Sequence, residues 1–295
     1  MGRFFGTLMR SFEEFGKDRV PRLAAALSYY TIFAIAPILI LIIAIVGFIY
    51  GSEEARAQLV GQLSEAVGPE AANLVAGMIE QTAEGGTGVF ATVISIVTIL
   101  VGATGVTAQL QMALNDIWKV PQAERQGLWH TVKLRLRGLL MVLGIGLIAI
   151  FSFALQTAVN IVVANFEGLL PIPDWLLWIL NQVVTVALIT AAIALLFRYL
   201  SDADMEWRDV WPGAILTGIL IKVGEIALGI YLGTSGVGSA FGAAGSLVVL
   251  LLFIYYSAQI LFFGAEFTYV VASRNREESG ETREGGSSGR EQPGR

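Results

Sequence analysis

Long uncharged, apolar stretches alternate with short polar ones along the chain. Five stretches contain no Asp, Glu, Lys or Arg: Leu23–Ser52, Gly85–Asn115, Gly138–Phe166, Trp175–Phe197 and Ile226–Ala265. Each exceeds the roughly 18 residues that mark a membrane-helix candidate. The last is too long for one crossing and is interrupted by turn-forming residues at 233–242. The pattern predicts an all-α, polytopic membrane protein with six transmembrane helices, at residues 23–50, 88–114, 138–164, 175–198, 211–233 and 243–272.

Three segments lie outside these helices and divide the chain further. Residues 1–22 place aromatic residues on one face and charges on the other, which is typical of a helix at the membrane interface or packed on the end of the bundle. Residues 52–87 form the largest connection and predict two amphipathic helices, broken at Gly68-Pro69, that cap the outer, extracytoplasmic face of the bundle. Residues 273–295 are rich in Gly, Ser, Glu and Arg, so we expect a disordered tail.

The distribution of basic residues predicts the orientation. Lys and Arg gather before the first helix, between helices two and three, around the fourth connection and after helix six, whereas the other connections contain only Arg56. By the positive-inside rule, both termini are cytoplasmic, which agrees with an even number of crossings. Only 15% of the 295 residues are charged, against about 25% in soluble proteins. We expect a multi-pass protein of the bacterial cytoplasmic (inner) membrane.

The fifth predicted helix contains two charges near its middle, Lys222 and Glu225. They are three positions apart, so their side chains can meet, and they share a stripe with Ala214, Gly218 and Gly229. A charge at mid-membrane costs about 2.5–3.5 kcal/mol on insertion scales. The stripe should therefore face protein or water. Two interpretations remain open: a functional polar interior, or a neutralised pair that fixes the packing of the helix.

Other polar and flexible positions join this stripe as candidates. Ionisable and amide side chains inside predicted helices suggest a candidate intramembrane polar site. Its members are Lys222, Glu225, Glu266, Gln111, Asn115 and Gln259. Proline and glycine within the helices are candidate hinge or packing positions. These are Pro37, Gly102, Gly105, Pro212, Gly218 and Gly229.

The residues that common enzyme chemistries need are missing or isolated. The chain has no cysteine and one histidine, His130, so thiolate chemistry is excluded and no histidine metal cluster is present. Asp202 and Asp204 are close in sequence, but such a pair more often caps or solvates a loop than hydrolyses a phosphodiester. No phosphate-binding or dinucleotide-binding glycine motif is present. We expect neither an enzyme nor a cofactor.

Four stretches resemble the YihY/BrkB family of bacterial inner-membrane proteins, which is also labelled ribonuclease BN-like. They are Ala24–Leu41, Ala113–Trp118, Trp207–Leu216 and Phe241–Phe267. They occur in the order and spacing of that family across residues 20 to 272. Phe241 and Phe253 stand where the family more often has Tyr and Trp. The resemblance implies six membrane helices and no particular reaction.

Two functions remain open at this stage. The first is a transporter-like translocator of lipid or solute through a polar interior lined by Lys222 and Glu225. The alternative is a membrane scaffold for envelope integrity, which acts through a protein partner or as a homo-oligomer. Basic residues beside the inner leaflet favour contact with anionic lipid headgroups rather than nucleic acid. They are Arg125, Lys133, Arg135 and Arg137.

Overall fold

All regular structure in the described part of the chain is helical. The computed structural model describes residues 2–83, 105–121, 136–138, 140, 144, 147–148, 150–151, 154, 174–235 and 244–287. The labelled helices are α1 (Gly2–Lys17), α2 (Val20–Tyr50), α3 (Ser52–Val67), α4 (Pro69–Ala83), α7 (Asp174–Tyr199), α8 (Trp207–Ser235) and α10 (Gly245–Ser287). Residues 105–117 and the described positions from 136 to 154 are helical as well.

Four of these helices are long and apolar enough to cross a membrane. The search covered the described residues only and found Val20–Ile49, Ile179–Tyr199, Trp207–Tyr231 and Gly245–Glu277. They correspond to the first, fourth, fifth and sixth predicted membrane helices. Much of the second and third, at 88–114 and 138–164, lies outside the described residues.

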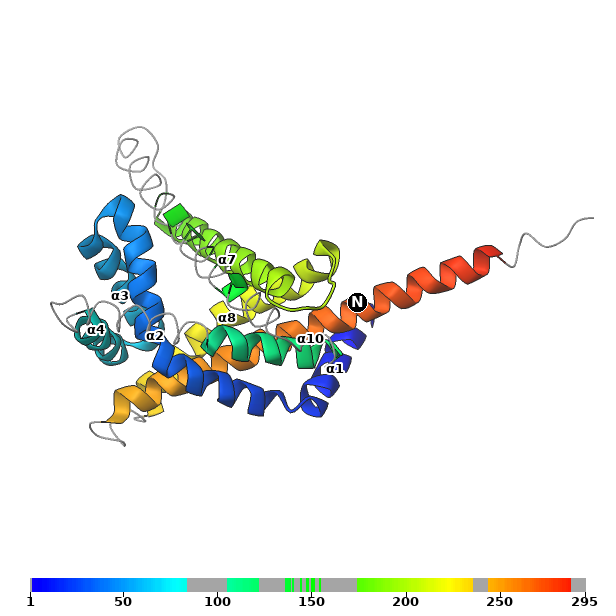
Figure 1. Ribbon diagram of the computed structural model, residues 1–295, viewed down its shortest axis with the longest axis horizontal. Coiled ribbons are helices and arrows are strands. Elements are labelled where there is room, and N and C mark those ends of the chain that lie inside the picture. The colour runs from blue at the N-terminus through cyan, green and yellow to red at the C-terminus, as the bar shows by residue number, and fades with distance from the viewer. Residues whose placement is uncertain are drawn as a thin grey trace, which may run out of the picture.

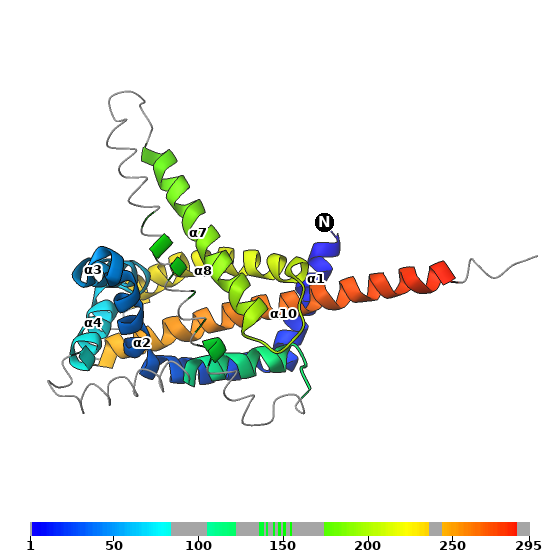
Figure 2. The same cartoon turned by 45° about the horizontal axis from the view of Figure 1, so that its top comes forward.

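The long helices lie between two ends of different construction. In Figures 1 and 2, α3 and α4 lie at one end of the bundle, while α1 lies at the other, beside the second half of α10. We call these the α3–α4 end and the α1 end. Helix α10 contacts both α2 and α8 along the bundle. Helix α7 contacts α8, and its N-terminal end leans away from the other helices in Figure 2.

Helices α8 and α10 are antiparallel and approach closely because glycines face threonines. A Cβ on Gly213 would lie 1.8 Å from Thr268 Oγ1 and 2.7 Å from the backbone oxygen of Gly264. A Cβ on Gly264 would lie 1.7 Å from Thr217 Oγ1. Each threonine hydroxyl donates to a carbonyl of its own helix, at 2.7 Å for Thr217 and 2.9 Å for Thr268. Small residues therefore set the distance between the two helices.

The α3–α4 hairpin packs against α2 at one end of the bundle. Gly51 and Gly68, at the starts of α3 and α4, have positive φ angles of 94° and 88°. Glycine adopts such angles without steric cost. Buried residues of α4, including Val75 and Ile79, form an apolar cluster with Ala36 of α2 and residues of α10.

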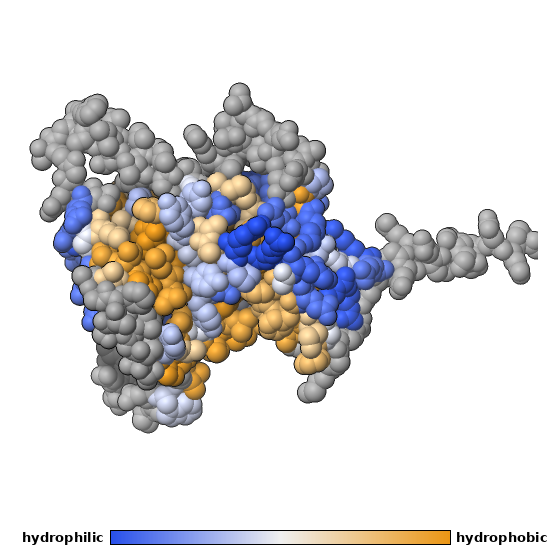
Figure 3. Space-filling view, turned by 90° about the horizontal axis from the view of Figure 1, so that it is seen from below, coloured by the Kyte–Doolittle hydropathy of each residue, from blue (hydrophilic) through white to orange (hydrophobic). Residues whose placement is uncertain are grey.

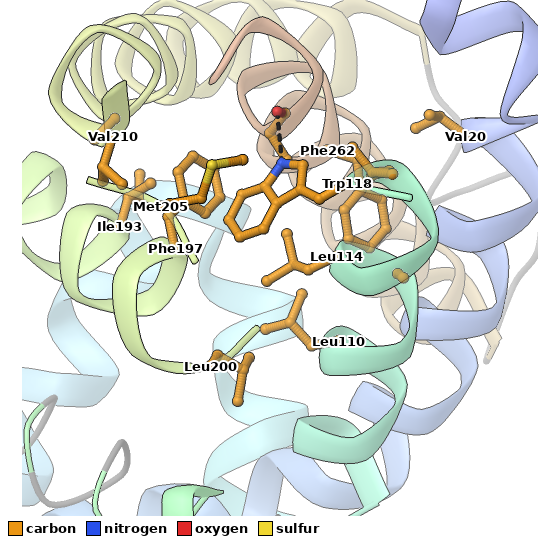
Figure 4. Packing of buried hydrophobic residues seen from close by; sticks show 14 of the residues in the cluster. Val20, Leu110, Leu114, Trp118, Ile193, Phe197, Leu200, Met205, Val210 and Phe262 are labelled. Atoms are coloured by element: carbon orange, nitrogen blue, oxygen red, sulfur yellow. Dashed lines mark hydrogen bonds between the residues drawn. The ribbon is translucent and has the colours of Figure 1, made fainter. Parts of the chain in front are cut away.

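The main apolar core lies toward the α1 end. Trp118, just after the helix at 105–117, packs edge-on against Phe197 of α7, with ring centroids 5.7 Å apart. Its Nε1 donates to the carbonyl oxygen of Ala265 in α10 at 2.9 Å. Figure 4 shows this bond and the surrounding side chains, among them Leu114 and Phe262. Helices from distant parts of the sequence are therefore joined around one indole ring.

The surface of the long helices is unusually apolar. Phe33, Val183 and Val223 are among many large apolar side chains that are more than half exposed. Figure 3 shows apolar residues on the body of the molecule and polar ones toward the end from which α10 projects. Contiguous exposed apolar surface of this extent suits lipid rather than water.

Helix α10 extends further than the sequence suggests. The composition predicts a disordered tail from residue 273, whereas α10 continues to Ser287, and residues 288–295 lie outside the described part of the chain. Extending an existing helix needs no new nucleation, and Glu and Arg are good helix formers.

Candidate functional site

The six candidate polar residues do not form one site. Lys222 and Glu225 pair with each other on α8. Gln111 and Asn115 bind a loop residue at the α1 end. Glu266 is buried separately in α10, and Gln259 is partly buried on that helix.

Lys222 and Glu225 form the expected ion pair. Lys222 Nζ lies 3.0 Å from Glu225 Oε2, and the two side chains are 21% and 24% exposed. Between them, Gly224 abuts Tyr256 of α10, where a Cβ would lie 2.6 Å from the ring. Because Gly213 faces Thr268 in the same antiparallel pair, Gln259 lies at the level of Lys222.

A second polar cluster converges on Asp202, in the connection 200–206 between α7 and α8. Gln111 Nε2 donates to Asp202 Oδ2 at 2.8 Å, and Asn115 Nδ2 donates to the same oxygen at 2.9 Å. Arg137 forms an ion pair with Oδ1. Asn115 also accepts hydrogen bonds through its Oδ1, from the Ser201 hydroxyl at 2.7 Å and from the Asp202 amide at 2.9 Å. We call Gln111, Asn115, Arg137, Ser201 and Asp202 the Asp202 cluster.

The Asp202 cluster favours an ionised carboxylate. Burial raises the pKa of Asp202, but hydrogen bonds from Asn115, Arg137 and Gln111, together with the charge of Arg137, lower it more. The net pKa is below the ordinary value of an aspartate. Asp202 is therefore a fixed negative charge at the α1 end.

A cavity of about 590 Å³ lies directly against this cluster. Its charged part is formed by Arg137, Arg198, Asp202 and Asp204. Its walls are apolar and come from α7 and from the helical positions Leu140, Gly144 and Ile148. Wall residues Leu140 and Tyr199 are also 58% and 60% exposed on the outer surface. The cavity thus joins a charged floor at the α1 end to the apolar face of the bundle.

Sequence reasoning identifies Asp202 only as a loop carboxylate and assigns no role to Arg198. Gln111 and Asn115 could have indicated that an acceptor such as Asp202 lies nearby. These amides lie four residues apart, so they present donors on one helix face that require an acceptor. Arg137, which the sequence analysis expects beside lipid headgroups, forms an ion pair with Asp202. Arg125, Lys133, Arg135 and His130 lie outside the described residues.

The candidate hinge positions differ in their surroundings. Pro37 lies inside a continuous α2, and Pro212 lies near the start of α8. Gly218 is a packing position, since a Cβ there would lie 2.4 Å from Thr190 Oγ1 of α7. Gly105 makes ordinary contact with Tyr30, and Gly229 faces open space. Gly102 lies outside the described residues.

A family model described as Virulence factor BrkB matches residues 11–287. The chain belongs to the BrkB family. This confirms the resemblance seen in the sequence. The regular structure of the described residues consists of helices, and four of these helices are long and apolar enough to cross a membrane. Both observations agree with a membrane protein of this family.

Proteins with similar sequences include bacterial membrane proteins. The UPF0761 membrane protein of Verminephrobacter eiseniae is 27% identical over 268 residues, which cover 88% of this chain and 61% of that protein. That of Alcanivorax borkumensis is 28% identical, with 89% of this chain and 59% of that protein covered. That of Mannheimia succiniciproducens is 25% identical, with 90% of each covered. The chain thus spans about three fifths of the first two relatives. No solved structure matches it significantly.

Proposed function

We propose that this BrkB-family protein is a translocator that binds a membrane amphiphile and moves it between leaflets. The observation that carries the proposal is the cavity beside the Asp202 cluster, which combines a charged floor with apolar walls. Binding sites for small molecules are generally apolar clefts with a few placed polar groups, and this volume falls within their usual range. A headgroup would lie at the floor and an acyl chain along the wall that Leu140 and Tyr199 share with the outer surface.

Arg198 is the best placed residue to meet a headgroup. Its guanidinium lies 3.8 Å from Asp204, whose side chain is fully exposed, so the pair is loose. Arg137, in contrast, is held by Asp202. A loose arginine at the floor of the cavity can exchange its partner for a phosphate at little cost.

Lys222 and Glu225 give the translocation path a polar step inside the membrane. In this role Lys222 would hold an anionic group while Glu225 balances its charge or relays a proton. Their partial exposure within α8 supports this role. Ionisable groups inside a membrane mark substrate or ion pathways more often than lipid-facing surface.

The proposal includes six crossings with both termini in the cytoplasm of a bacterium. Lys119 contacts Asp18 and Arg137 contacts Asp202, so residues on both sides of segment 122–135 lie at the α1 end. Helix α4 lies at the opposite end. The stretch from 84 to 117 would then cross the membrane once, and the stretch from 138 to 174 once more.

The test uses purified protein in vesicles that contain fluorophore-labelled phosphatidylethanolamine. Loss of fluorescence after an impermeant quencher is added reports lipid movement from the inner leaflet. We expect Arg198→Gln to slow movement about tenfold, since a hydrogen bond to a charged group contributes about 1.5–3 kcal/mol. Lys222→Met should abolish movement without unfolding the protein. Arg208→Gln removes the same charge at an exposed site outside the cavity and should have no effect.

Wild-type vesicles that move the probe no faster than protein-free vesicles would refute this function. If Arg198→Gln and Lys222→Met moved the labelled lipid as fast as the wild type, the path through the cavity and past Lys222 would be refuted. Loss of activity in Arg208→Gln as well would indicate a general charge effect instead of a binding site.

A further inference from the structure

Helix α1 packs on the bundle with a side that carries small polar residues. Thr7 and Ser11 of α1 are buried, and the helix contacts α10. The Ser11 hydroxyl donates to the backbone oxygen of Thr7 at 2.9 Å. Arg274 of α10 donates to the Thr7 hydroxyl at 3.4 Å. The buried hydroxyls therefore have partners, and this side of α1 is completed by the protein itself.

A second side of α1 leaves large apolar side chains uncovered. Phe5, Met9 and Phe12 are 64%, 52% and 58% exposed. Their spacing of four and three residues puts them on one face of the helix, which we call the exposed face of α1. An amphipathic helix in water turns its apolar face to the core, and α1 does the reverse. The exposed face of α1 therefore requires apolar surroundings outside the chain.

Two neighbouring residues of α10 place α1 level with the beginning of α8. Arg274 reaches α1, and Asn275 donates to Asp209 of α8 at 2.7 Å. On either side of Asp209, Trp207 and Trp211 are 40% and 44% exposed, with ring centroids 6.4 Å apart. Exposed tryptophans of membrane proteins gather at the level of the lipid headgroups. Helix α1 therefore lies at the boundary between membrane and water.

The direction of α1 suits a position along this boundary. In Figures 1 and 2, α1 crosses α10 instead of running beside it, so it lies across the long apolar helices. The ring of Phe12 packs on that of Phe263, with centroids 4.7 Å apart. Phe263 lies inside the candidate membrane span Gly245–Glu277. The exposed face of α1 is therefore continuous with the apolar surface that the bundle turns to lipid.

The remaining side of α1 is charged and suits the headgroup layer. Arg10, Glu13 and Lys17 are exposed there, and Lys17 also pairs with Glu14 at 2.7 Å. Because this side carries charges of both signs, attraction to a bilayer comes from the apolar face rather than from net charge. Arg10 follows Met9 directly, so its long side chain can extend from the apolar boundary to the phosphates.

We propose that α1 is a membrane-surface helix, which inserts Phe5, Met9 and Phe12 between the phospholipids of the leaflet at the α1 end. These side chains lie where the headgroups meet the acyl chains, and Arg10 contacts the phosphates. The partner of this face is the bilayer itself. Helix α1 thus both packs on the bundle and lies at the membrane interface. This role does not depend on amphiphile translocation or on the cavity at the Asp202 cluster.

Fluorophores on single cysteines test this position in the full chain, which has no natural cysteine. The protein is placed in phosphatidylcholine nanodiscs in which some lipids carry a nitroxide at the headgroup end of an acyl chain. We expect nitrobenzoxadiazole on Met9→Cys to emit at shorter wavelength than in water and to be quenched by the nitroxide lipid. On Arg10→Cys, the next residue and on the charged side, the same probe should be quenched mainly by iodide in the water.

Val223→Cys provides the lipid reference, because its side chain is 57% exposed on α8 within a candidate membrane span. All three variants replace exposed side chains, and circular dichroism verifies that each is folded. If iodide but not the nitroxide lipid quenched the probe on Met9→Cys, the exposed face of α1 would lie in water and the proposal would be overturned. Protection from both quenchers, with cross-linking of Met9→Cys chains to each other on oxidation, would overturn it in favour of a second copy.

Discussion

At the scale of single residues, Asp202 joins segments that are far apart in the sequence. It lies in a short connection, yet it accepts from Gln111 and Asn115 of one helix and from Arg137 of another segment. Its side chain is only 14% exposed. The charge of this carboxylate therefore holds the floor of the cavity together.

Replacement of Asp202 by Asn should destabilise the protein in a pH-dependent way. The folded-state pKa of Asp202 is below its ordinary value of 3.8, so its carboxylate stabilises the fold at all pH values above 3.8. That stabilisation is lost as pH falls through the folded-state pKa. At pH 7 we expect Asp202→Asn to lower the free energy of unfolding by about 1–3 kcal/mol. Below pH 3.8, the difference between the variant and the wild type should shrink.

Asp204→Asn provides the control for this prediction. It makes the same chemical change two residues away, where the side chain is fully exposed and its arginine partner is 3.8 Å distant. Thermal unfolding in mild detergent at the two pH values measures both variants. If Asp202→Asn lost the same stability at both pH values, the packing of the Asp202 side chain, and not its negative charge, would stabilise the fold.

At the scale of helices, a close crossing joins the beginning of α8 to α10. Gly213 and Gly264 allow backbone contact, and Thr217 and Thr268 fill the remaining space. Because the threonine hydroxyls are bound to their own helices, they cannot move aside freely.

Gly213→Ala should therefore disrupt this crossing. The new methyl group would meet the backbone oxygen of Gly264 at 2.7 Å, which no rotamer change relieves. Overpacking of this kind costs about 1–3 kcal/mol. Gly229→Ala, in the same helix, is the matched control because nothing lies within 4 Å of its Cβ position. Gly229→Ala should change the free energy of unfolding by no more than about 1 kcal/mol, in the stabilising direction, because alanine favours a helix more than glycine does. Equal thermal stability of the two variants in detergent would contradict the close crossing.

The sequence predicts the helices much better than their contacts. Apolar runs define α2, α7, α8 and the first part of α10 to within a few residues, because each crossing needs a minimum apolar length. Periodicity also placed Gly218 on a stripe of small residues. It could not reveal that Gly213 and Gly264 are the closest contacts, because neighbours across helices depend on register and not on spacing within one helix.

At the scale of the whole molecule, the candidate polar residues lie at different places along the bundle. Sequence reasoning grouped Gln111 and Asn115 with Lys222, since all are polar and lie in predicted helices. The structure places the amides at the α1 end with Asp202, whereas Lys222 pairs within α8. The partner that decided this arrangement is in a loop, and a loop residue has no periodicity that would link it to a distant helix.

The two ends of the bundle should lie on opposite sides of the membrane, which single cysteines can test because the natural chain has none. Gln81→Cys lies on an exposed position of α4 at the α3–α4 end, and Arg208→Cys lies on an exposed position at the start of α8. Basic residues favour the cytoplasmic side, so an impermeant thiol reagent should label Gln81→Cys in right-side-out vesicles and Arg208→Cys only in inside-out vesicles. Glu277→Cys, exposed on α10, should follow Arg208→Cys. If Gln81→Cys and Arg208→Cys were labelled from the same side, the two ends of the bundle would not lie on opposite sides of the membrane, and the six crossings would have to be abandoned.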